Sequence, residues 1–158
     1  MNNFGLSFWL LVFSTLLTFI LLIYIAHRKE RKQLHTIFIL NLVCVLIISI
    51  GVLCQTLCNY YFSIPSIWFE NIIYIGTCFL PVFVFFTGEI FVNTKIKFKK
   101  TYLLLFVIPI LSLIILWTNN FHHLFYVNYS SSFTDTTYGP YFYIHTIYSY
   151  TLLVLGIL

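Results

Sequence analysis

Apolar residues fill five long stretches of this chain, and short polar segments separate them. A helix needs about 20 apolar residues to cross the hydrocarbon core of a bilayer. The stretches are continuous, without the period-two alternation of membrane strands. They therefore predict an all-α, polytopic membrane helix bundle with about five transmembrane helices, at residues 6–26, 36–57, 68–92, 102–117 and 141–158.

The composition indicates that the bilayer is the solvent for this chain. Of its 158 residues, 61% are hydrophobic and only 8% are charged, whereas a soluble domain carries about 25% charged residues. Too few polar side chains exist to cover a surface that faces water. We expect the lipid bilayer as the main partner and a multi-pass location. The net charge of +4 is confined to two clusters, so we do not expect nucleic acid as a partner.

The basic residues predict how the chain is threaded through the membrane. Short cytoplasmic loops collect Lys and Arg, and all eight of these residues fall within loops 27–35 and 93–101. Loops 58–67 and 118–140 contain none. We therefore expect the amino terminus and these two loops on the outside. The residues that set this topology are Arg28, Lys29, Arg31, Lys32, Lys95, Lys97, Lys99 and Lys100.

Glu89 is a candidate functional carboxylate, because charged groups within membrane spans are usually functional. It lies six residues before Lys95, which is about 9 Å along a helix, and so near the cytoplasmic interface. Asn41 enters the second span from the same side at a similar depth. We expect Asn41 and Glu89 to form a hydrogen-bonded polar pair between spans two and three. A switch or ion-coupling role for Glu89 is the alternative.

Loop 118–140 is expected to fold into an outer cap, because its aromatic side chains favour the membrane surface. Adjacent histidines in this loop would point about 100° apart on a helix, so they share one metal ion poorly. No metal spacing is matched, and no cysteine pair has redox or zinc spacing. We therefore predict no metal site and no cofactor. The candidate residues for an outer signal are Asn119, His122, His123, Tyr126, Tyr138 and His145.

Several short motifs follow one another along the second half of the chain. They are Leu80-Pro81, Phe86-Thr-Gly-Glu89, Ile108-Pro109, Thr118-Asn119, His122-His-Leu-Phe125, Tyr138-Gly-Pro140, His145 and Tyr148-Ser-Tyr150. This succession resembles the N-terminal seven-transmembrane sensor region of bacterial histidine kinases, a module that also precedes diguanylate cyclases. The chain departs from the family pattern at the end of span three. The family usually has a Glu-Tyr-Thr-Gly-like element there, whereas Thr87 and Gly88 here precede Glu89.

The resemblance implies a membrane-embedded signal-input module in the inner (plasma) membrane of a bacterium. It implies that residues 62–71 and 118–143 form an outer surface that receives an unknown extracellular or membrane ligand. It also implies a homodimer, by analogy with histidine kinases. Because the family has seven spans, we expect this five-span sequence to be a truncated input region. The missing partners would be two C-terminal helices and a cytoplasmic output domain.

Two other functions stay open on the sequence alone. A small transporter or channel component would place charged or broken-helix sites near the bilayer midplane, whereas Glu89 is predicted near an interface. A membrane-embedded hydrolase or metal enzyme would have to use His122, His123, Asp135 or His145. The sequence contains no phosphate-binding loop, nucleophile elbow or zinc-protease helix. We therefore predict no catalytic residue and no enzyme activity for this chain.

Overall fold

A computed structural model describes residues 5–28, 32–62, 67–96, 99–130 and 135–158 of the chain. Helices make up most of it, and the predicted all-α membrane bundle is confirmed. The elements are α1 (Leu6–Ala26), α2 (Gln33–Phe62), α3 (Ile67–Asn93), the 3-10 helix η1 (Lys100–Phe106), α4 (Val107–Trp117), α5 (Asn119–His122), β1 (Tyr126–Asn128), β2 (Thr137–Tyr138) and α6 (Pro140–Ile157).

Four segments of the described chain are long and apolar enough to span a membrane: α1, α2, α3, and η1 together with α4. Helix α6 is not among them. Its first half carries tyrosine, histidine, threonine and serine side chains between the apolar ones, and these lower its mean hydropathy. The chain is therefore a multi-pass membrane protein, while a fifth span at α6 stays a prediction.

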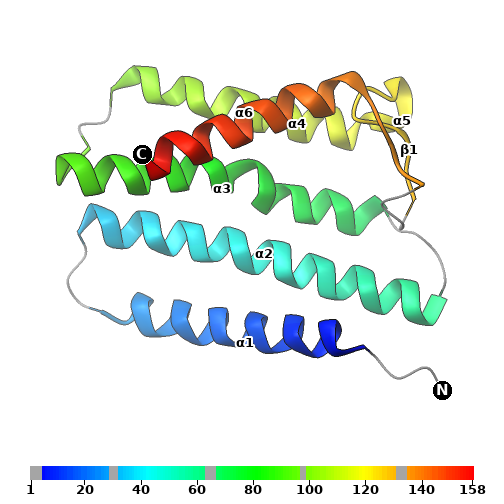
Figure 1. The fold of residues 1–158 in the computed structure, drawn as a ribbon, viewed down its shortest axis with the longest axis horizontal. Coiled ribbons are helices and arrows are strands. Elements are labelled where there is room, and N and C mark those ends of the chain that lie inside the picture. Colours follow the sequence, from blue (N-terminus) through cyan, green and yellow to red (C-terminus); the bar gives the residue numbers. More distant parts are fainter. Residues whose placement is uncertain (1–4, 29–31, 63–66, 97–98, 131–134) are drawn as a thin grey trace.

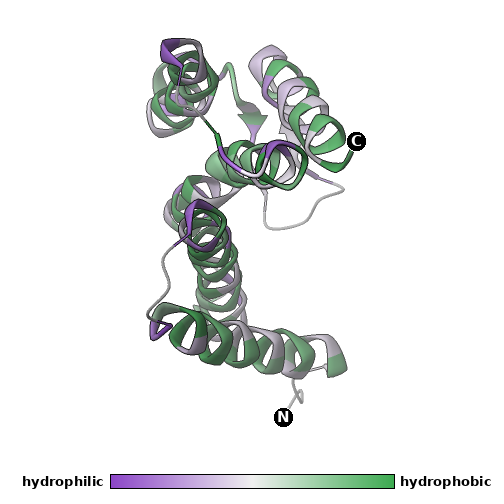
Figure 2. Cartoon of the chain, turned by 90° about the vertical axis from the view of Figure 1, so that its left-hand side faces the viewer, coloured by the Kyte–Doolittle hydropathy of each residue, from purple (hydrophilic) through white to green (hydrophobic). Residues whose placement is uncertain are grey.

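The helices pack in two groups around α3. Helices α1, α2 and α3 form a row in which each packs on the next (Figure 1). Figure 2 shows α4 and α6 lying side by side against the other side of α3. Two glycines permit the contact of α3 with α6, since a Cβ atom at Gly88 would lie 2.1 Å from the carbonyl oxygen of Gly156. Small residues let membrane helices approach closely in this way.

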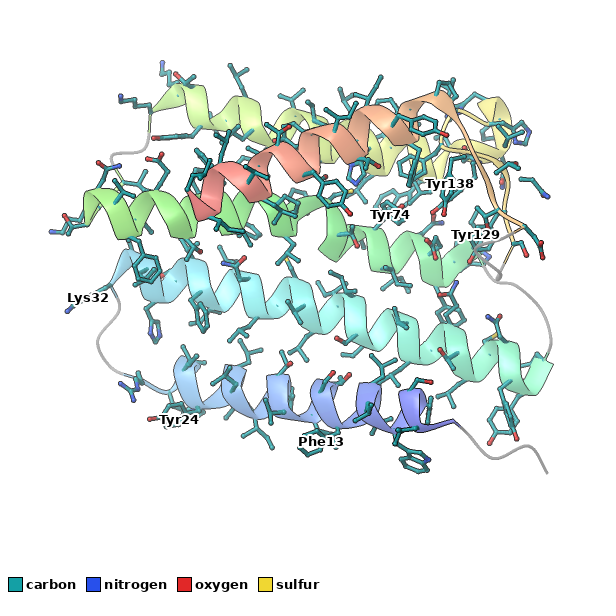
Figure 3. The ribbon with its side chains drawn as sticks, in the orientation of Figure 1. Phe13, Tyr24, Lys32, Tyr74, Tyr129 and Tyr138 are labelled. Atoms are coloured by element: carbon teal, nitrogen blue, oxygen red, sulfur yellow. The ribbon has the colours of Figure 1, made fainter. Side chains whose placement is uncertain are left out.

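The described residues of the two basic loops lie at one end of the bundle. Arg28 follows α1, Lys95 follows α3, and Lys99 and Lys100 begin η1, all at the end marked by Lys32 in Figure 3. We call this the basic end. The start of α1 and the strands β1 and β2 lie at the opposite end (Figure 1), which we call the hairpin end. Lys29, Arg31 and Lys97 lie outside the described residues. Which end faces the cytoplasm is set by the charge rule alone.

The two prolines within the spans lie in different positions. Pro81 is inside α3, and the ribbon of α3 bends about halfway along (Figure 1), as expected where a backbone donor is missing. Pro109 is the third residue of α4, directly after the 3-10 segment η1. In the first turn of a helix the N–H groups have no helical acceptor, so Pro109 begins α4 rather than kinking it.

Candidate functional site at the hairpin end

Asn119 holds the loop between α4 and β1 in place. Its Oδ1 accepts hydrogen bonds from the backbone N–H groups of Phe125 (2.9 Å) and Tyr126 (3.0 Å), and its Nδ2 donates to the carbonyl of Tyr126 (2.8 Å). The side chain is 4% exposed. A buried amide that pairs three backbone groups is a scaffold element. Asn119 therefore shapes the candidate site from within the fold.

The His-His-Leu-Phe and Tyr-Gly-Pro motifs form a single structure. Strands β1 and β2 pair antiparallel, with Tyr126 opposite Tyr138. Just beyond this pair, the N–H of Gly139 donates to the carbonyl of Phe125 (2.8 Å) and the N–H of Tyr141 donates to that of Leu124 (3.0 Å). A Cβ atom at Gly139 would lie 2.1 Å from the Leu124 carbonyl oxygen. The two segments therefore meet through their backbones, and only glycine fits between them.

The adjacent histidines shape the turn that leads into β1. His122 accepts the N–H of Leu124 at Nδ1 (3.0 Å), and its Nε2 lies 2.9 Å from the hydroxyl oxygen of Thr118. That hydroxyl donates to the carbonyl of Ile114 (2.7 Å), so Nε2–H of His122 is the donor to Thr118. His123 ends α5 with a left-handed φ of 52°. Among the described residues, no three His, Cys, Asp or Glu side chains gather where they could hold a metal ion.

His145 lies inside the bundle, directly beneath the hairpin. Its side chain is 4% exposed, and its Nδ1 lies 3.0 Å from the hydroxyl oxygen of Ser112 on α4. Ser112 donates to the carbonyl of Ile108 (2.8 Å), so it accepts the Nδ1–H of His145. The imidazole packs beside Tyr74 and Phe125, with ring centroids 5.7 and 5.9 Å away. His145 thus joins α6 to α4 and supports the hairpin from below.

The polar centre of the hairpin end is Glu70, in the first turn of α3. Its Oε1 accepts a hydrogen bond from the hydroxyl of Tyr126 (2.9 Å), and its Oε2 accepts one from Nε2 of Gln55 on α2 (3.3 Å). The same Nε2 donates to the hydroxyl of Tyr129 (2.6 Å). The hydroxyl oxygens of Tyr126 and Tyr74 are 3.3 Å apart. We call Gln55, Glu70, Tyr74, Tyr126 and Tyr129 the hairpin network.

Three of the tyrosines labelled in Figure 3 mark where this network lies. Tyr74 on α3, Tyr129 after β1 and Tyr138 in β2 gather where α3 meets the hairpin. A small cavity of about 70 Å³ lies here, lined by Gln55, Glu70, Tyr126, Tyr129, Ser130, Thr136 and Tyr138. It has polar groups on most sides and room for a few water molecules. The cavity is thus suited to water or to a very small polar solute.

The tyrosines of the hairpin end keep their protons beside the carboxyl group of Glu70. Burial, reinforced by the neighbouring Tyr74 and Glu70, raises the pKa of Tyr126 far above its ordinary value. Burial and then Glu70 raise the pKa of Tyr129 to about 12. Both tyrosines therefore keep their protons at neutral pH. Tyr126 can then donate its hydroxyl proton in the hydrogen bond to Glu70. The positive end of the α3 dipole also favours a carboxylate in this first turn.

Sequence reasoning did not single out Glu70. It lies within the predicted outer surface of residues 62–71, yet it was not among the candidate residues. A signal was present, because Glu70 is a carboxylate at the start of a membrane span and such residues are usually functional. The partners of Glu70 could not be found in this way, since Gln55 and Tyr126 are far from it in the sequence. Of the predicted outer residues, Tyr126 and Tyr138 line the cavity, while Asn119, His122, His123 and His145 support the fold around it.

The predicted hydrogen bond between Asn41 and Glu89 is wrong. Nδ2 of Asn41 instead donates to the hydroxyl oxygen of Thr87 (2.9 Å), and Glu89 accepts from Nδ2 of Asn93 (3.2 Å). Residues two positions apart in a helix point about 200° apart, so Thr87 faces α2 and Glu89 does not. Spans two and three are thus joined by a polar contact at the predicted depth, but through a different residue of α3.

The chain was compared with protein families, curated proteins and solved structures. No match was found among the curated proteins or among the solved structures. Residues 10–158 match the family described as the N-terminal 7TM region of histidine kinase. This match covers nearly the whole chain, including all the helices described above except the start of α1. The matched part is the membrane input region of such kinases and not their catalytic part. The chain therefore belongs to the family of N-terminal seven-transmembrane regions of histidine kinases.

Proposed function

We propose that the hairpin end is the signal-receiving part of this histidine kinase input region, in the plasma membrane of a bacterium. The observation that carries the proposal is the position of Glu70 on α3. Its carboxylate accepts hydrogen bonds from the hairpin through Tyr126 and from α2 through Gln55. A ligand or a change at the membrane surface that displaces the hairpin therefore acts directly on two spanning helices.

The hairpin is also connected to the second group of helices. Asn119 links β1 to the segment after α4, and α6 begins at Pro140, directly after the contact of Gly139 with Phe125. Helix α6 then crosses α3 near Gly88 and Gly156, on the side of the basic end. We expect a shift at the hairpin to reach this crossing through α6, because coupling between distant sites can pass through packed elements. Such a shift, passed on to a cytoplasmic output domain, would be the signal.

The chemistry of the cavity favours a stimulus that carries hydrogen-bond donors. The carboxyl oxygens of Glu70 are acceptors at the wall of this cavity, and the hydroxyl of Tyr126 and Nε2 of Gln55 are already their donors. A small solute with N–H or O–H groups would compete with Tyr126 for Glu70 and loosen the hairpin. A signalling role requires two states that the stimulus favours unequally, and here these are the hairpin with and without the bond to Glu70.

Hydrogen–deuterium exchange on the chain in lipid nanodiscs tests this proposal. Glu70→Gln should speed exchange at Tyr126 and Tyr138 in the hairpin. It should also change exchange at Ile96, whose N–H is held at the basic end by Oε1 of Gln33 (2.9 Å). Glu89→Gln is the matched control, because it makes the same change on the same helix away from the hairpin, and it should leave hairpin exchange as in the wild type.

The proposal fails if Glu70→Gln affects only the hairpin and leaves the basic end unchanged. In that case the hairpin is a local cap without connection to the other side of the membrane.

We also infer that the region acts as a homodimer, as its family suggests. Single-molecule photobleaching of the labelled chain in nanodiscs tests the dimer separately, and a single bleaching step throughout would contradict it.

A further inference from the structure

An open groove lies at the basic end between α1, α2 and α3. Its volume is about 490 Å³. The last turns of α1 contribute Leu21 and Ile25, α2 contributes Phe38, and α3 contributes Phe91. A second groove of about 590 Å³ shares Lys32, Leu34 and Phe91 with the first. The hollow therefore runs from α1 past the start of α2 to the end of α3, and we call the first part the basic groove.

The mouth of the basic groove is positively charged. Arg28 and Lys32 line it, and Lys95 lines the adjoining groove. The described lining residues of both grooves include no Asp or Glu. The guanidinium of Arg28 lies over the ring of Tyr24, with its central carbon 5.1 Å from the ring centroid, and it donates to the Tyr24 hydroxyl. Arg28 is thus held in position, and four of its five N–H donors are not engaged by that hydroxyl.

The groove also contains a buried polar atom without a partner. Nε2 of His35 has no hydrogen-bond partner among the described residues, and His35 lines the groove. Thr87, another polar lining residue, is already paired, because its hydroxyl donates to the carbonyl of Phe83 (2.8 Å) and accepts from Asn41. Buried polar groups are normally paired. Among the lining residues, His35 therefore has unmet polarity, one helical turn after Lys32.

We propose that the basic groove binds an anionic glycerophospholipid. The phosphate lies between Arg28 and Lys32, and one acyl chain lies along the apolar side chains of Leu21, Ile25 and Phe38. Arginine presents a planar set of donors that fits phosphate oxygens. Basic pockets between membrane helices on the cytoplasmic side suit lipid headgroups, and that leaflet is rich in anionic lipids. The site is separate from the hairpin network and does not depend on its signalling role.

The bound lipid would also be a packing partner of α1. Within α1 only Thr15 is buried among the described residues, and many of its large apolar side chains face outward, as Phe13 does in Figure 3. The groove lies between α1 and the last turns of α3. A lipid there fills the space that the protein leaves open and fixes the position of α1 relative to α3.

The whole chain, reconstituted in phosphatidylcholine vesicles, can be used to test this site. Electron paramagnetic resonance of spin-labelled lipids measures how strongly each lipid associates with the protein. Labelled phosphatidylglycerol should associate more strongly with the protein than labelled phosphatidylcholine. The double substitution Arg28→Gln with Lys32→Gln should weaken this preference about fivefold for each lost charge. The control is Lys99→Gln with Lys100→Gln, which removes the same charge from the same end outside the groove and should leave most of the preference.

Two further measurements distinguish a specific lipid site from a diffuse surface charge and from a site for a soluble anion. Arg28→Lys with Lys32→Arg keeps both charges and should keep the preference, and circular dichroism should show the same helix content in every variant. The proposal is overturned if the two glutamine pairs lose the preference equally, because a diffuse surface potential is then sufficient. It is also overturned if inorganic phosphate displaces the lipid as well as unlabelled phosphatidylglycerol does, because the site then takes a soluble anion.

Discussion

The hairpin network and the basic groove lie at opposite ends of one bundle, and they treat polar groups differently. In the hairpin network the carboxylate of Glu70 has two donors from the protein, and the cavity beside it is only about 70 Å³. The basic groove is about 490 Å³, and Nε2 of His35 in its wall has no partner among the described residues. The first region is closed by its own side chains, while the second is open and suited to a bound molecule.

Because of this difference, we expect substitutions in the two regions to have different effects. A closed network loses stability when any member is removed, because each group leaves a partner unpaired. An open groove tolerates substitution of its lining residues, and the effect appears in binding instead. Substitutions at the hairpin end should therefore lower the stability of the fold, whereas equivalent substitutions near the basic end should have little effect on it.

The largest effect is expected for Gly139→Ala. The new Cβ atom would lie 2.1 Å from the carbonyl oxygen of Leu124, and neither backbone segment can yield without breaking the hairpin. The loss should be about 3 kcal/mol, as for overpacked sites, seen as a lower melting temperature in detergent. Gly5→Ala is the control, since its Cβ would meet only Ser7 at 3.7 Å. Equal melting temperatures for both variants would contradict the close contact at Gly139.

Asn119→Ala should have the next largest effect. It removes the partner of three backbone groups in the loop before β1, at a cost of about 2 kcal/mol for groups left buried and unpaired. Amide exchange at Phe125 and Tyr126 should become faster. Asn120→Ala changes the exposed neighbour and should leave that exchange unchanged. If Asn119→Ala keeps slow exchange, the amide is not the scaffold of the loop.

Tyr126→Phe should lower stability by about 1.5 kcal/mol, because a hydrogen bond to a charged group is lost. A double-mutant cycle with Glu70→Gln isolates the interaction, since the second substitution should cost much less once the first is present. Tyr143→Phe removes a hydroxyl from an exposed side chain of α6 and serves as the control. Additive effects of the first two substitutions would show that Tyr126 and Glu70 do not interact.

Alkaline pH should loosen the hairpin through Tyr129. Its pKa is about 12 in the folded chain, compared with about 10 for an unfolded tyrosine. The folded state therefore holds the proton more tightly, and this contribution to stability is complete below about pH 10 and lost as the pH rises through about 12. In that range hairpin exchange should rise more steeply in the wild type than in Tyr129→Phe, which has no hydroxyl to ionise. Parallel pH curves for the two proteins would contradict the raised pKa.

The smallest effect is expected for Asn41→Leu. The substitution removes the hydrogen bond to Thr87, and such bonds between membrane helices contribute about 0.6 kcal/mol on average. It also removes the buried Oδ1 of Asn41, which has no partner among the described residues. These two effects oppose each other, so the melting temperature should change very little. A loss comparable to that of Asn119→Ala would show that polar contacts matter equally at both ends.

Part of the candidate site could be predicted from the sequence. The aromatic and polar character of loop 118–140 pointed to an outer cap, and Tyr126 and Tyr138, which line its cavity, were among the candidates. Glu70 was not, although its place at the start of a span was a signal. The partners of Glu70 come from α2 and β1, and no sequence pattern relates residues so far apart. The Asn41 prediction failed for a similar reason, because depth along a helix does not specify which face a residue occupies.

The sequence by itself determined the class of fold and the order of apolar spans and charge clusters along the chain. Long apolar stretches can satisfy their backbone groups in lipid only as helices, and charge clusters are readable without any structure. The tertiary structure alone decided which residues meet. It joined the His-His-Leu-Phe and Tyr-Gly-Pro segments at Gly139, turned Thr87 instead of Glu89 toward Asn41, and opened the basic groove beside Arg28 and Lys32. These outcomes depend on helix rotation and on contacts between distant segments, which follow from packing in three dimensions.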